Sequence, residues 1–528
     1  MACISMKDIA KIQNSFLLLY RLKIKTLMNI KPFYSGVLPL LLTAYSLHTQ
    51  AQNMVMLSPA DSPSTIIEKA ACVVPSVRQY AWQQQELTAF LHFGMNTFTN
   101  KEWGEGTDSP SLFNPTNFDA EQWIKTLRNA GFKTAILTCK HHDGFCLWQT
   151  AYTDYSVKSS PWLNGKGDVV RAVSDACKKY GMGFGVYLSP WDRNSKFYGT
   201  SAYNDYFVSQ LKELLTQYGE VSEVWFDGAC GEGPNGKKQE YDFVRWYKII
   251  RELQPKAVIA VMGPDVRWVG TESGRGRETE WSVVPMDNLS QEQIAANSQK
   301  EMITPPSGDM VGNDLGSREK IMQAKALVWY PAETDVSIRP GWFYHQTEDD
   351  KVKTPKELME IYYSSVGRNG VLLLNVPPTP EGLISQKDVA SLMGFKQLLD
   401  KTFQTNLLAP SKNIVKIEKA QPKKIDASAY YVNKQLKDIY SLSYTLRQPI
   451  SFNVIALQED ILKGQRVEKF VVEVRSSKKD AWRVVAEGTT IGYKRLLRIP
   501  TCEAKQVRLR VLEARGQVNI AFFGVYQN

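Results

Sequence analysis

TAILTCKHHDGF, residues 134–145, joins an apolar run to a short cluster of polar side chains. The apolar part predicts a buried strand, and His141 and His142 stand side by side where that strand ends. In proteins that alternate strands with helices, ligands bind at this end of the strands. The pair is informative because the 528-residue chain has only five histidines: His48, His92, His141, His142 and His345. The segment therefore predicts a core strand and one wall of a functional site.

On either side of this segment, short apolar runs alternate with amphipathic helical patterns. The predicted strands are almost wholly apolar, which is typical of a parallel sheet covered by helices. Eight of them favour a (β/α)8-like barrel over an open doubly wound sheet, which more often has a glycine-rich phosphate loop after its first strand. The predicted helices are 119–130, 168–180, 203–218 and 242–253. The predicted strands are 89–94, 132–139, 183–188, 223–226, 257–262, 267–270, 327–330 and 370–375.

The pattern changes after about residue 405. Alternating strands such as 470–474 and 507–511, separated by turns, indicate an all-β domain, which we expect to be a sandwich. This region contains no histidine and no evident pair of acids, so a structural or glycan-binding role is favoured over catalysis. The expected division is an export signal region at 1–51, a catalytic barrel at 52–405 and a β-sandwich at 406–528.

The N-terminal segment has the features of an export signal. Lys31 closes a basic region, and residues 33–47 are mostly apolar but too short to span a bilayer comfortably. Thr49 and Ala51 supply small residues at the −3 and −1 positions of a cleavage site. Met28 is the expected start, because residues 1–27 resemble no part of a signal peptide. We therefore expect export to a periplasm or to the exterior, with no membrane span elsewhere in the chain.

Charge and cysteine content exclude two classes of protein. The net charge is +10, but residues 1–51 carry six basic side chains and one acidic one, which leaves +5 for the other 477 residues. Without a stripe of Lys and Arg, no nucleic-acid partner is expected. The seven cysteines are scattered and do not form a disulfide framework, and Cys139 and Cys177 fall at expected core positions.

The ends of the predicted strands are rich in polar and aromatic residues. In a barrel these ends converge on one mouth, so residues far apart in the sequence become neighbours. Carboxylates, neutral histidines and several tryptophans suit a sugar, because indole faces stack on pyranose rings while polar groups bind hydroxyls. The residues in question are His92, Glu102, Trp103, His141, His142, Tyr187, Trp191, Asp227 and Glu272.

Paired carboxylates are the expected machinery for breaking a glycosidic bond, with carboxyl groups roughly 5 Å apart in retaining enzymes. Asp227 is the stronger candidate, because an aspartate directly after the apolar strand 223–226 is costly unless the strand ends in a functional mouth. The alternative is a helix N-cap or a turn aspartate before Gly228. A metal site built on His141 and His142 is disfavoured, because adjacent strand residues point to opposite sides and no HxH or HExxH spacing is present.

The chain resembles glycoside hydrolase family 29, the retaining α-L-fucosidases, over most of residues 75–528. The resemblance implies a (β/α)8-like barrel followed by a β-sandwich, and an exo-acting enzyme that needs no metal or cofactor. It also implies a fucosylated oligosaccharide or glycoconjugate as the substrate. The motifs that carry it are LHFGMNTFTNKEWGEG (91–106), KHHDGFCLW (140–148), GVYLSPWDRN (185–194), EVWFDGA (223–229), GPDVRWVGTESG (263–274), WYPAETDVSIRPGWFYH (329–345) and NGVLLLNVPPTPEGL (369–383).

Matched by position, the resemblance implies that Asp227 is the nucleophile and Glu272 the acid/base, with Glu278 and Glu280 as rivals for the second role. It implies that Arg267 holds a nearby carboxylate ionised. The 263–274 motif is similar to the subgroup that acts on α1,3/4-linked fucose in branched, Lewis-type glycans. A broad-specificity fucosidase and a non-catalytic carbohydrate-binding protein remain alternatives. The implied hydroxyl ligands are His92, Glu102, His141 and His142, and the implied walls are Trp103, Tyr187, Trp191 and Trp342.

Overall fold

The computed structural model describes residues 52–286, 312–421 and 439–528. The predicted export signal and the start at Met28 lie outside the described residues. No helix in the described ranges is both long and apolar enough to cross a bilayer.

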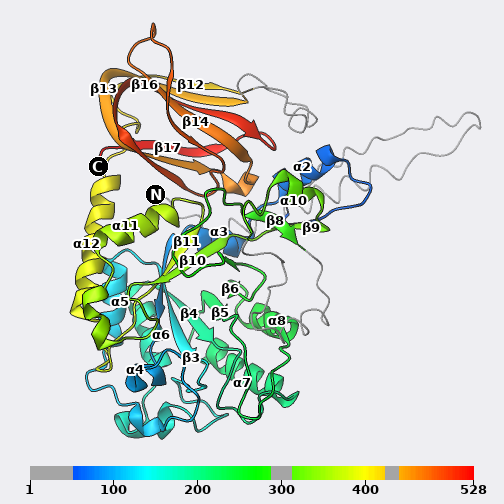
Figure 1. The fold of residues 1–528 in the computed structure, drawn as a ribbon, viewed down its shortest axis with the longest axis vertical. Helices are drawn as coiled ribbons and strands as arrows, with labels where there is room; N and C mark the ends of the chain where they lie inside the picture. Colours follow the sequence, from blue (N-terminus) through cyan, green and yellow to red (C-terminus); the bar gives the residue numbers. More distant parts are fainter. Residues whose placement is uncertain (1–51, 287–311, 422–438) are drawn as a thin grey trace, which may run out of the picture. The chain divides into compact units, whose positions relative to one another are not determined.

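Eight parallel strands form the central sheet, in the order β6-β5-β4-β3-β2-β11-β10-β7. The two outer strands, β6 and β7, follow one another in the chain, so the sheet is nearly closed. This arrangement confirms the predicted (β/α)8-like barrel (Figure 1). The strands are β2 (Leu87–Leu91), β3 (Thr134–Lys140), β4 (Gly183–Leu188), β5 (Glu223–Phe226), β6 (Val258–Val261), β7 (Arg267–Trp268), β10 (Ala332–Ser337) and β11 (Val371–Asn375).

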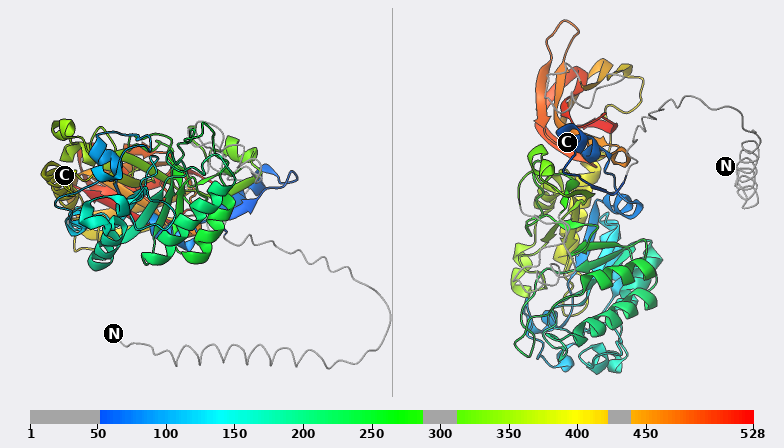
Figure 2. Two further views of the ribbon diagram at one scale, coloured as in Figure 1. Left: turned by 90° about the horizontal axis from the view of Figure 1, so that it is seen from below. Right: turned by 90° about the vertical axis from the view of Figure 1, so that its right-hand side faces the viewer.

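Four predicted helices lie between the first five barrel strands, and three of them begin at an aspartate cap. Asp119, Asp168 and Asp242 each accept a hydrogen bond from a backbone N–H of the first turn. Helix α6 ends at Gly181, whose φ of +68° is the left-handed conformation that glycine adopts readily. Both views of Figure 2 show these cyan and green helices outside the barrel strands. They are α5 (Ala120–Asn129), α6 (Val169–Tyr180), α7 (Ala202–Gln217) and α8 (Phe243–Leu253).

One predicted barrel strand was wrong. Residues 326–329 do form a strand, β9 (Ala326–Trp329), but it pairs antiparallel with β1 (Met54–Met56) and β8 (Val283–Met286) in a separate three-stranded sheet. The barrel strand is β10, five residues further on. Its sequence, AETDVS, gave no apolar signal because Glu333, Thr334 and Asp335 are buried polar residues with partners inside the barrel.

Aromatic rings fill the interior of the barrel beneath its mouth. The Tyr187 ring stacks on Trp225, with centroids 5.3 Å apart, and Phe90 meets Trp225 edge to face at 5.0 Å. Such offset and edge contacts are the favoured arrangements for aromatic pairs. Cys139 and Cys177 are buried, as predicted.

The C-terminal region is a six-stranded antiparallel sheet, which confirms the predicted all-β domain. The long strand β13 pairs with β12 through its first half and with β17 through its second half, while β16 pairs along its other side. Before this sheet come α11 (Pro355–Ser364) and α12 (Gln386–Phe403). The strands are β12 (Ile414–Ala420), β13 (Tyr440–Glu459), β14 (Val467–Arg475), β15 (Arg483–Gly488), β16 (Arg495–Ala514) and β17 (Ile520–Tyr526).

Candidate active site

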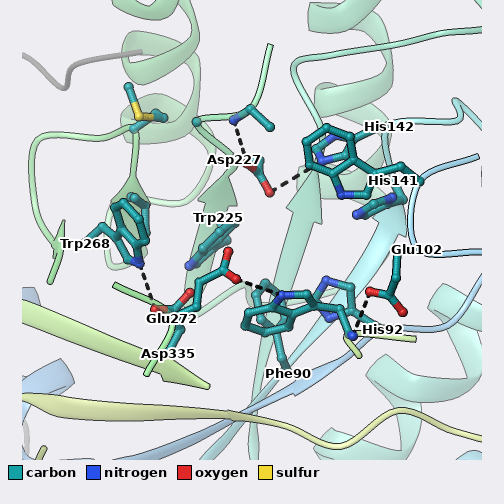
Figure 3. A pocket seen from close by; sticks show the side chains of 16 residues that line it. Phe90, His92, Glu102, His141, His142, Trp225, Asp227, Trp268, Glu272 and Asp335 are labelled. Carbon is teal, nitrogen blue, oxygen red and sulfur yellow. Dashed lines mark hydrogen bonds and ion pairs between the residues drawn. The ribbon is translucent and has the colours of Figure 1, made fainter. Parts of the chain in front are cut away.

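A pocket opens at the carboxyl ends of the barrel strands, and it brings together most of the predicted site residues (Figure 3). They come from five strands and the segments that follow them, so the expected convergence at one mouth is what the structure has. The pocket is lined by Phe90, His92, Glu102, Trp103, His141, His142, Trp225, Asp227, Gly228, Ala229, Val261, Met262, Trp268, Glu272, Asp335 and Trp342.

Asp227 follows β5 directly, and its carboxylate is held by two donors. The backbone N–H of Ala229 donates to Oδ1 at 2.7 Å, and the hydroxyl of Tyr187 donates to Oδ2 at 3.1 Å. Nε2 of His142 lies 3.8 Å from Oδ2. No helix begins at this point, so the N-cap interpretation does not apply, although the contact with Ala229 is that of an Asx turn. Among the residues that the structure describes, no Lys or Arg forms an ion pair with this carboxylate, which is oriented in the pocket by its two donors.

The partners of His142 determine which ring nitrogen carries its proton. The Ser189 hydroxyl donates to the carbonyl oxygen of Trp191 at 2.7 Å, so its oxygen must accept from Nδ1 of His142 at 2.8 Å. Burial lowers the pKa of His142, although the nearby Asp227 carboxylate opposes this. The neutral ring therefore carries its proton on Nδ1 and offers Nε2 as an acceptor beside Asp227.

His92 has the same protonation for a similar reason. The amide nitrogen of Asn375 donates to Ser337 Oγ and to the carbonyl oxygen of Trp342, so Oδ1 of Asn375 is the atom that accepts from Nδ1 of His92, at 2.9 Å. Burial lowers the pKa of His92 to about 4. This ring is neutral near pH 7 and presents Nε2 as a second acceptor.

His141 has the opposite arrangement. The amide nitrogen of Asn96 donates to the backbone oxygen of Glu102 and lies 3.4 Å from Nδ1 of His141, which therefore accepts. Burial lowers the pKa of His141 well below its usual value, so the proton of the neutral ring is on Nε2. The three histidines thus offer two acceptors and one donor, a pattern that suits hydroxyl groups because each hydroxyl both donates and accepts.

Glu102 lines the pocket and also holds the segment that carries Trp342. Its Oε2 accepts from the backbone N–H of Trp342 at 2.8 Å, and its Oε1 accepts from that of Phe343 at 3.1 Å. Nε2 of His345 lies 2.6 Å from Oε1. No role was predicted for His345, and the available signal was its place at the end of the motif 329–345.

Glu272 lies on the connection after β7, across the pocket from the histidines (Figure 3). Its Oε2 accepts from the indole N–H of Trp342 at 3.2 Å. Burial raises the pKa of Glu272, and the negative charges of Asp227 and Glu102 add to this effect, while the Trp342 donor opposes it. Glu272 therefore holds a proton to higher pH than an ordinary glutamate.

The two rival glutamates lie elsewhere. The Glu278 side chain is 67% exposed and ion-paired with Arg368 and Arg495. Glu280 is buried between Arg267 and Arg277. Neither lines the pocket, so of the three candidates only Glu272 is in position to meet a bound sugar.

Three other predicted residues stand behind the lining or outside it. Tyr187 is buried beneath Asp227. The Trp191 ring packs 5.2 Å from His142 and 5.5 Å from the half-exposed Trp103. Arg267 is 1% exposed and does not line the pocket, so it is not placed to bind substrate directly. Its guanidinium pairs with the carboxylate of Glu280, in line with the expected pairing with a nearby carboxylate, and binds the backbone oxygens of Tyr330 and Trp281.

Sequence reasoning missed the pair Trp268 and Asp335. The Trp268 indole donates to Oδ1 of Asp335 at 2.7 Å, and both line the pocket. Burial raises the pKa of Asp335 well above its usual value. Asp335 lies within the quoted motif 329–345, but it belongs to β10, the strand that was not predicted because its residues are polar. Among the described residues, no three His, Cys, Asp or Glu side chains are grouped to hold a metal ion.

Comparison with known proteins gives consistent results. The sequence model of the family described as Alpha-L-fucosidase matches residues 70–402. Alpha-L-fucosidase 1 of Arabidopsis thaliana is 42% identical over 491 residues, covering 90% of this chain and 92% of that protein. A glycoside hydrolase 29 family member from an unknown rumen bacterium is 39% identical, with a TM-score of 0.71 over 86% of this chain and 77% of that one. A GH29 fucosidase of Ruminococcus gnavus, in complex with fucose, is 32% identical, with a TM-score of 0.71 over 90% of this chain and 97% of that one.

Proposed function

Because the chain belongs to the α-L-fucosidases of glycoside hydrolase family 29, we propose that it releases terminal α-L-fucose by a retaining, two-step reaction. Asp227 is the nucleophile and Glu272 the acid/base. The observation that carries these roles is the contrast between the two carboxyl groups in one pocket. Asp227 is oriented by N–H and O–H donors, whereas burial and neighbouring charge favour the protonated form of Glu272.

In the first step, a carboxylate oxygen of Asp227 attacks the anomeric carbon of fucose. The bond to the leaving oxygen breaks, and that oxygen takes the proton of Glu272. In the second step, Glu272 removes a proton from water, the water oxygen attacks the anomeric carbon, and Asp227 leaves. The two histidine acceptors and the one donor support hydroxyl binding and take no part in bond breaking.

The stereochemistry of the product tests the retaining mechanism. Retention predicts that ¹H NMR detects α-L-fucose as the first product, before mutarotation; β-L-fucose as the first product would contradict it.

Azide, used as an external nucleophile, tests which carboxylate is the nucleophile and which is the acid/base. A Glu272→Gly variant with azide is expected to give α-fucosyl azide, because azide attacks the glycosyl-enzyme. An Asp227→Gly variant is expected to give the β-azide, because azide attacks the substrate directly. If Glu272→Gly gave the β-azide and Asp227→Gly the α-azide, the roles of nucleophile and acid/base would have to be exchanged.

For the linkage, we propose α1,3/4-fucose in branched, Lewis-type glycans. Support comes from the sequence motif at 263–274 and from Trp103, which is 53% exposed at the pocket and offers an aromatic face to a sugar beyond fucose. The test is digestion of a glycan panel. The kcat/KM for Lewis-type trisaccharides should exceed that for an unbranched α1,2-linked fucoside and for an aryl fucoside. Equal values for all three would indicate a broad-specificity enzyme.

We also propose export to a periplasm or to the exterior, on the basis of the basic and apolar pattern in residues 28–51. Expression of the full chain in a bacterial host, followed by fractionation and N-terminal sequencing, tests this. The expected mature N-terminus is Gln52. Recovery of uncleaved protein from the cytoplasm alone would contradict it.

A further inference from the structure

The connection that carries Glu272 runs from β7 to β8 through residues 269–282 and is anchored at two places. Its first half is held by the barrel. The N–H of Gly274 donates to the backbone oxygen of Asp335 at 3.0 Å, and that of Gly276 donates to the oxygen of Ser364 at 2.7 Å. Gly274 has a φ of +68°, and a Cβ there would lie 2.8 Å from Val336, so this turn is tightly enclosed. The barrel therefore holds the turn at 274–276, between Glu272 and the second half of the connection.

The second half is held by side chains on the segments that join strands of the C-terminal sheet. Gln465 donates to the backbone oxygen of Glu280 at 2.9 Å and accepts from the N–H of Ser282 at 2.7 Å. The hydroxyl of Thr490 accepts from the N–H of Glu280 at 3.1 Å. Backbone groups of the connection are thus satisfied by side chains more than 180 residues away in the sequence, and the connection loses these partners if that sheet shifts.

Arg495, the first residue of β16, and Thr489, just before that strand, make the contacts of the C-terminal region nearest in sequence to Glu272, and the Thr489 hydroxyl donates to the backbone oxygen of Glu278 at 3.4 Å. One guanidinium nitrogen donates to the backbone oxygen of Glu278 at 2.7 Å, and another donates to Oε2 of the same residue at 3.1 Å. The Arg495 side chain is 6% exposed, so its bond to the carbonyl oxygen is shielded from water. The exposed carboxylate of Glu278, which also pairs with Arg368, contributes less.

We propose that the C-terminal sheet is a positioning element for the acid/base, acting through the grip of Arg495 on Glu278. The inference rests on the proposed role of Glu272. Arg495 touches neither the pocket lining nor Glu272, so it is a positioning residue. With Arg495 in place, both halves of the connection are anchored, and the Glu272 carboxylate accepts the hydrogen bond from the Trp342 indole. Without it, the backbone oxygen of Glu278 keeps only the longer hydrogen bond from the Thr489 hydroxyl, at 3.4 Å, and the carboxyl group of Glu272 is placed less accurately.

The experiment compares two substrates in each enzyme preparation. One is the Lewis-type oligosaccharide, whose sugar leaving group needs a proton. The other is 2,4-dinitrophenyl α-L-fucoside, whose leaving group does not. The ratio of the two kcat/KM values is independent of the folded fraction, so a loss of stability alone does not change it. For Arg495→Ala we expect the oligosaccharide value to fall about 10-fold or more and the aryl fucoside value to fall less than about 3-fold.

Arg498→Ala is the matched control. Arg498 lies three residues along the same strand and forms an ion pair with Glu360 of α11. Within the described part of the chain it makes no hydrogen bond or ion pair with residues 269–282, and it does not line the pocket. Its ratio should stay within about 2-fold of the wild-type ratio, because removing it leaves the connection anchored. Glu272→Gln is the reference and should shift the ratio in the same direction as Arg495→Ala, and further.

Three outcomes decide the matter. A shifted ratio in Arg495→Ala and an unchanged one in Arg498→Ala support the proposal. Equal losses on both substrates in Arg495→Ala, with a shifted ratio in Glu272→Gln, overturn the positioning role and leave the function of Glu272 intact. An unshifted ratio in Glu272→Gln removes the acid/base role itself, and the proposal fails with it.

Discussion

The two sides of the pocket are built in different ways. On one side, His92, His141 and His142 stand at the ends of β2 and β3, and their buried hydrogen-bond partners determine which nitrogen of each ring carries the proton. On the other side, Glu272 stands on the connection 269–282, which depends on the barrel, on Trp342 and on the C-terminal sheet. The side proposed to bind hydroxyls follows directly from two barrel strands, β2 and β3. The side proposed to move the proton depends on contacts that are distant in sequence.

The largest effect is expected where the two sides meet. Asp227→Ala removes the proposed nucleophile, so kcat/KM should fall on the order of 10⁴-fold or more. Thermal unfolding should change little, because in the described ranges the carboxylate makes two hydrogen bonds, with Ala229 and Tyr187. The exposed Asp154→Ala is the control and should behave as wild type. Near-normal turnover by the Asp227 variant would rule out the assignment.

The connection can be tested through its buried anchor. Arg267→Met leaves Glu280 with only Arg277 as a charged partner, so the free energy of unfolding should fall by roughly 3 kcal/mol. Denaturant unfolding measures this loss. The double variant Arg267→Met/Glu280→Leu should recover part of it, because the unpaired buried charge is then absent. A single variant as stable as wild type would show that this ion pair does not hold the connection.

The histidine side can be tested through Ser189. Ser189→Ala removes the acceptor that keeps the proton of His142 on Nδ1, and the proton can then move to Nε2, which faces Asp227. We expect kcat/KM to fall about 10-fold on the oligosaccharide and on the aryl fucoside alike, because hydroxyl binding and the nucleophile serve both. Ser195→Ala, which alters a buried serine away from the pocket, is the control. A selective loss on the oligosaccharide would contradict this account.

The smallest effect is a shift in pH dependence. Activity on the oligosaccharide needs protonated Glu272, so it should decline as pH rises through the pKa of that group. The Trp342 indole N–H stabilises the ionised form and holds this pKa down, although burial raises it overall. Trp342→Phe removes the donor, so the pKa should rise and the decline in kcat/KM should move to higher pH. A shift to lower pH, or none with an otherwise active variant, would contradict the proposed contact.

The same contrast explains where sequence-based prediction succeeded. The apolar runs and aspartate caps around α5, α6 and α8 located the elements of the barrel, since local periodicity and capping act over a few residues. Strand β10 was missed because its buried Glu333 and Asp335 find indole donors on β5 and β7, which local patterning does not reveal. The pairing of Arg267 with a carboxylate was expected, but its partner is Glu280, outside the pocket lining, which the local pattern did not reveal.

By itself, the sequence determined the alternation of strands and helices, the gathering of polar residues at the strand ends, and the residue types suited to a sugar. Those properties follow from hydrophobic periodicity and from the rule that parallel strands end at one mouth. Only the tertiary structure decided the proton positions on the three histidines, which of Glu272, Glu278 and Glu280 lines the pocket, and the link from the C-terminal sheet to the connection. Each of these depends on hydrogen-bond geometry between side chains far apart in the chain, which no local pattern encodes.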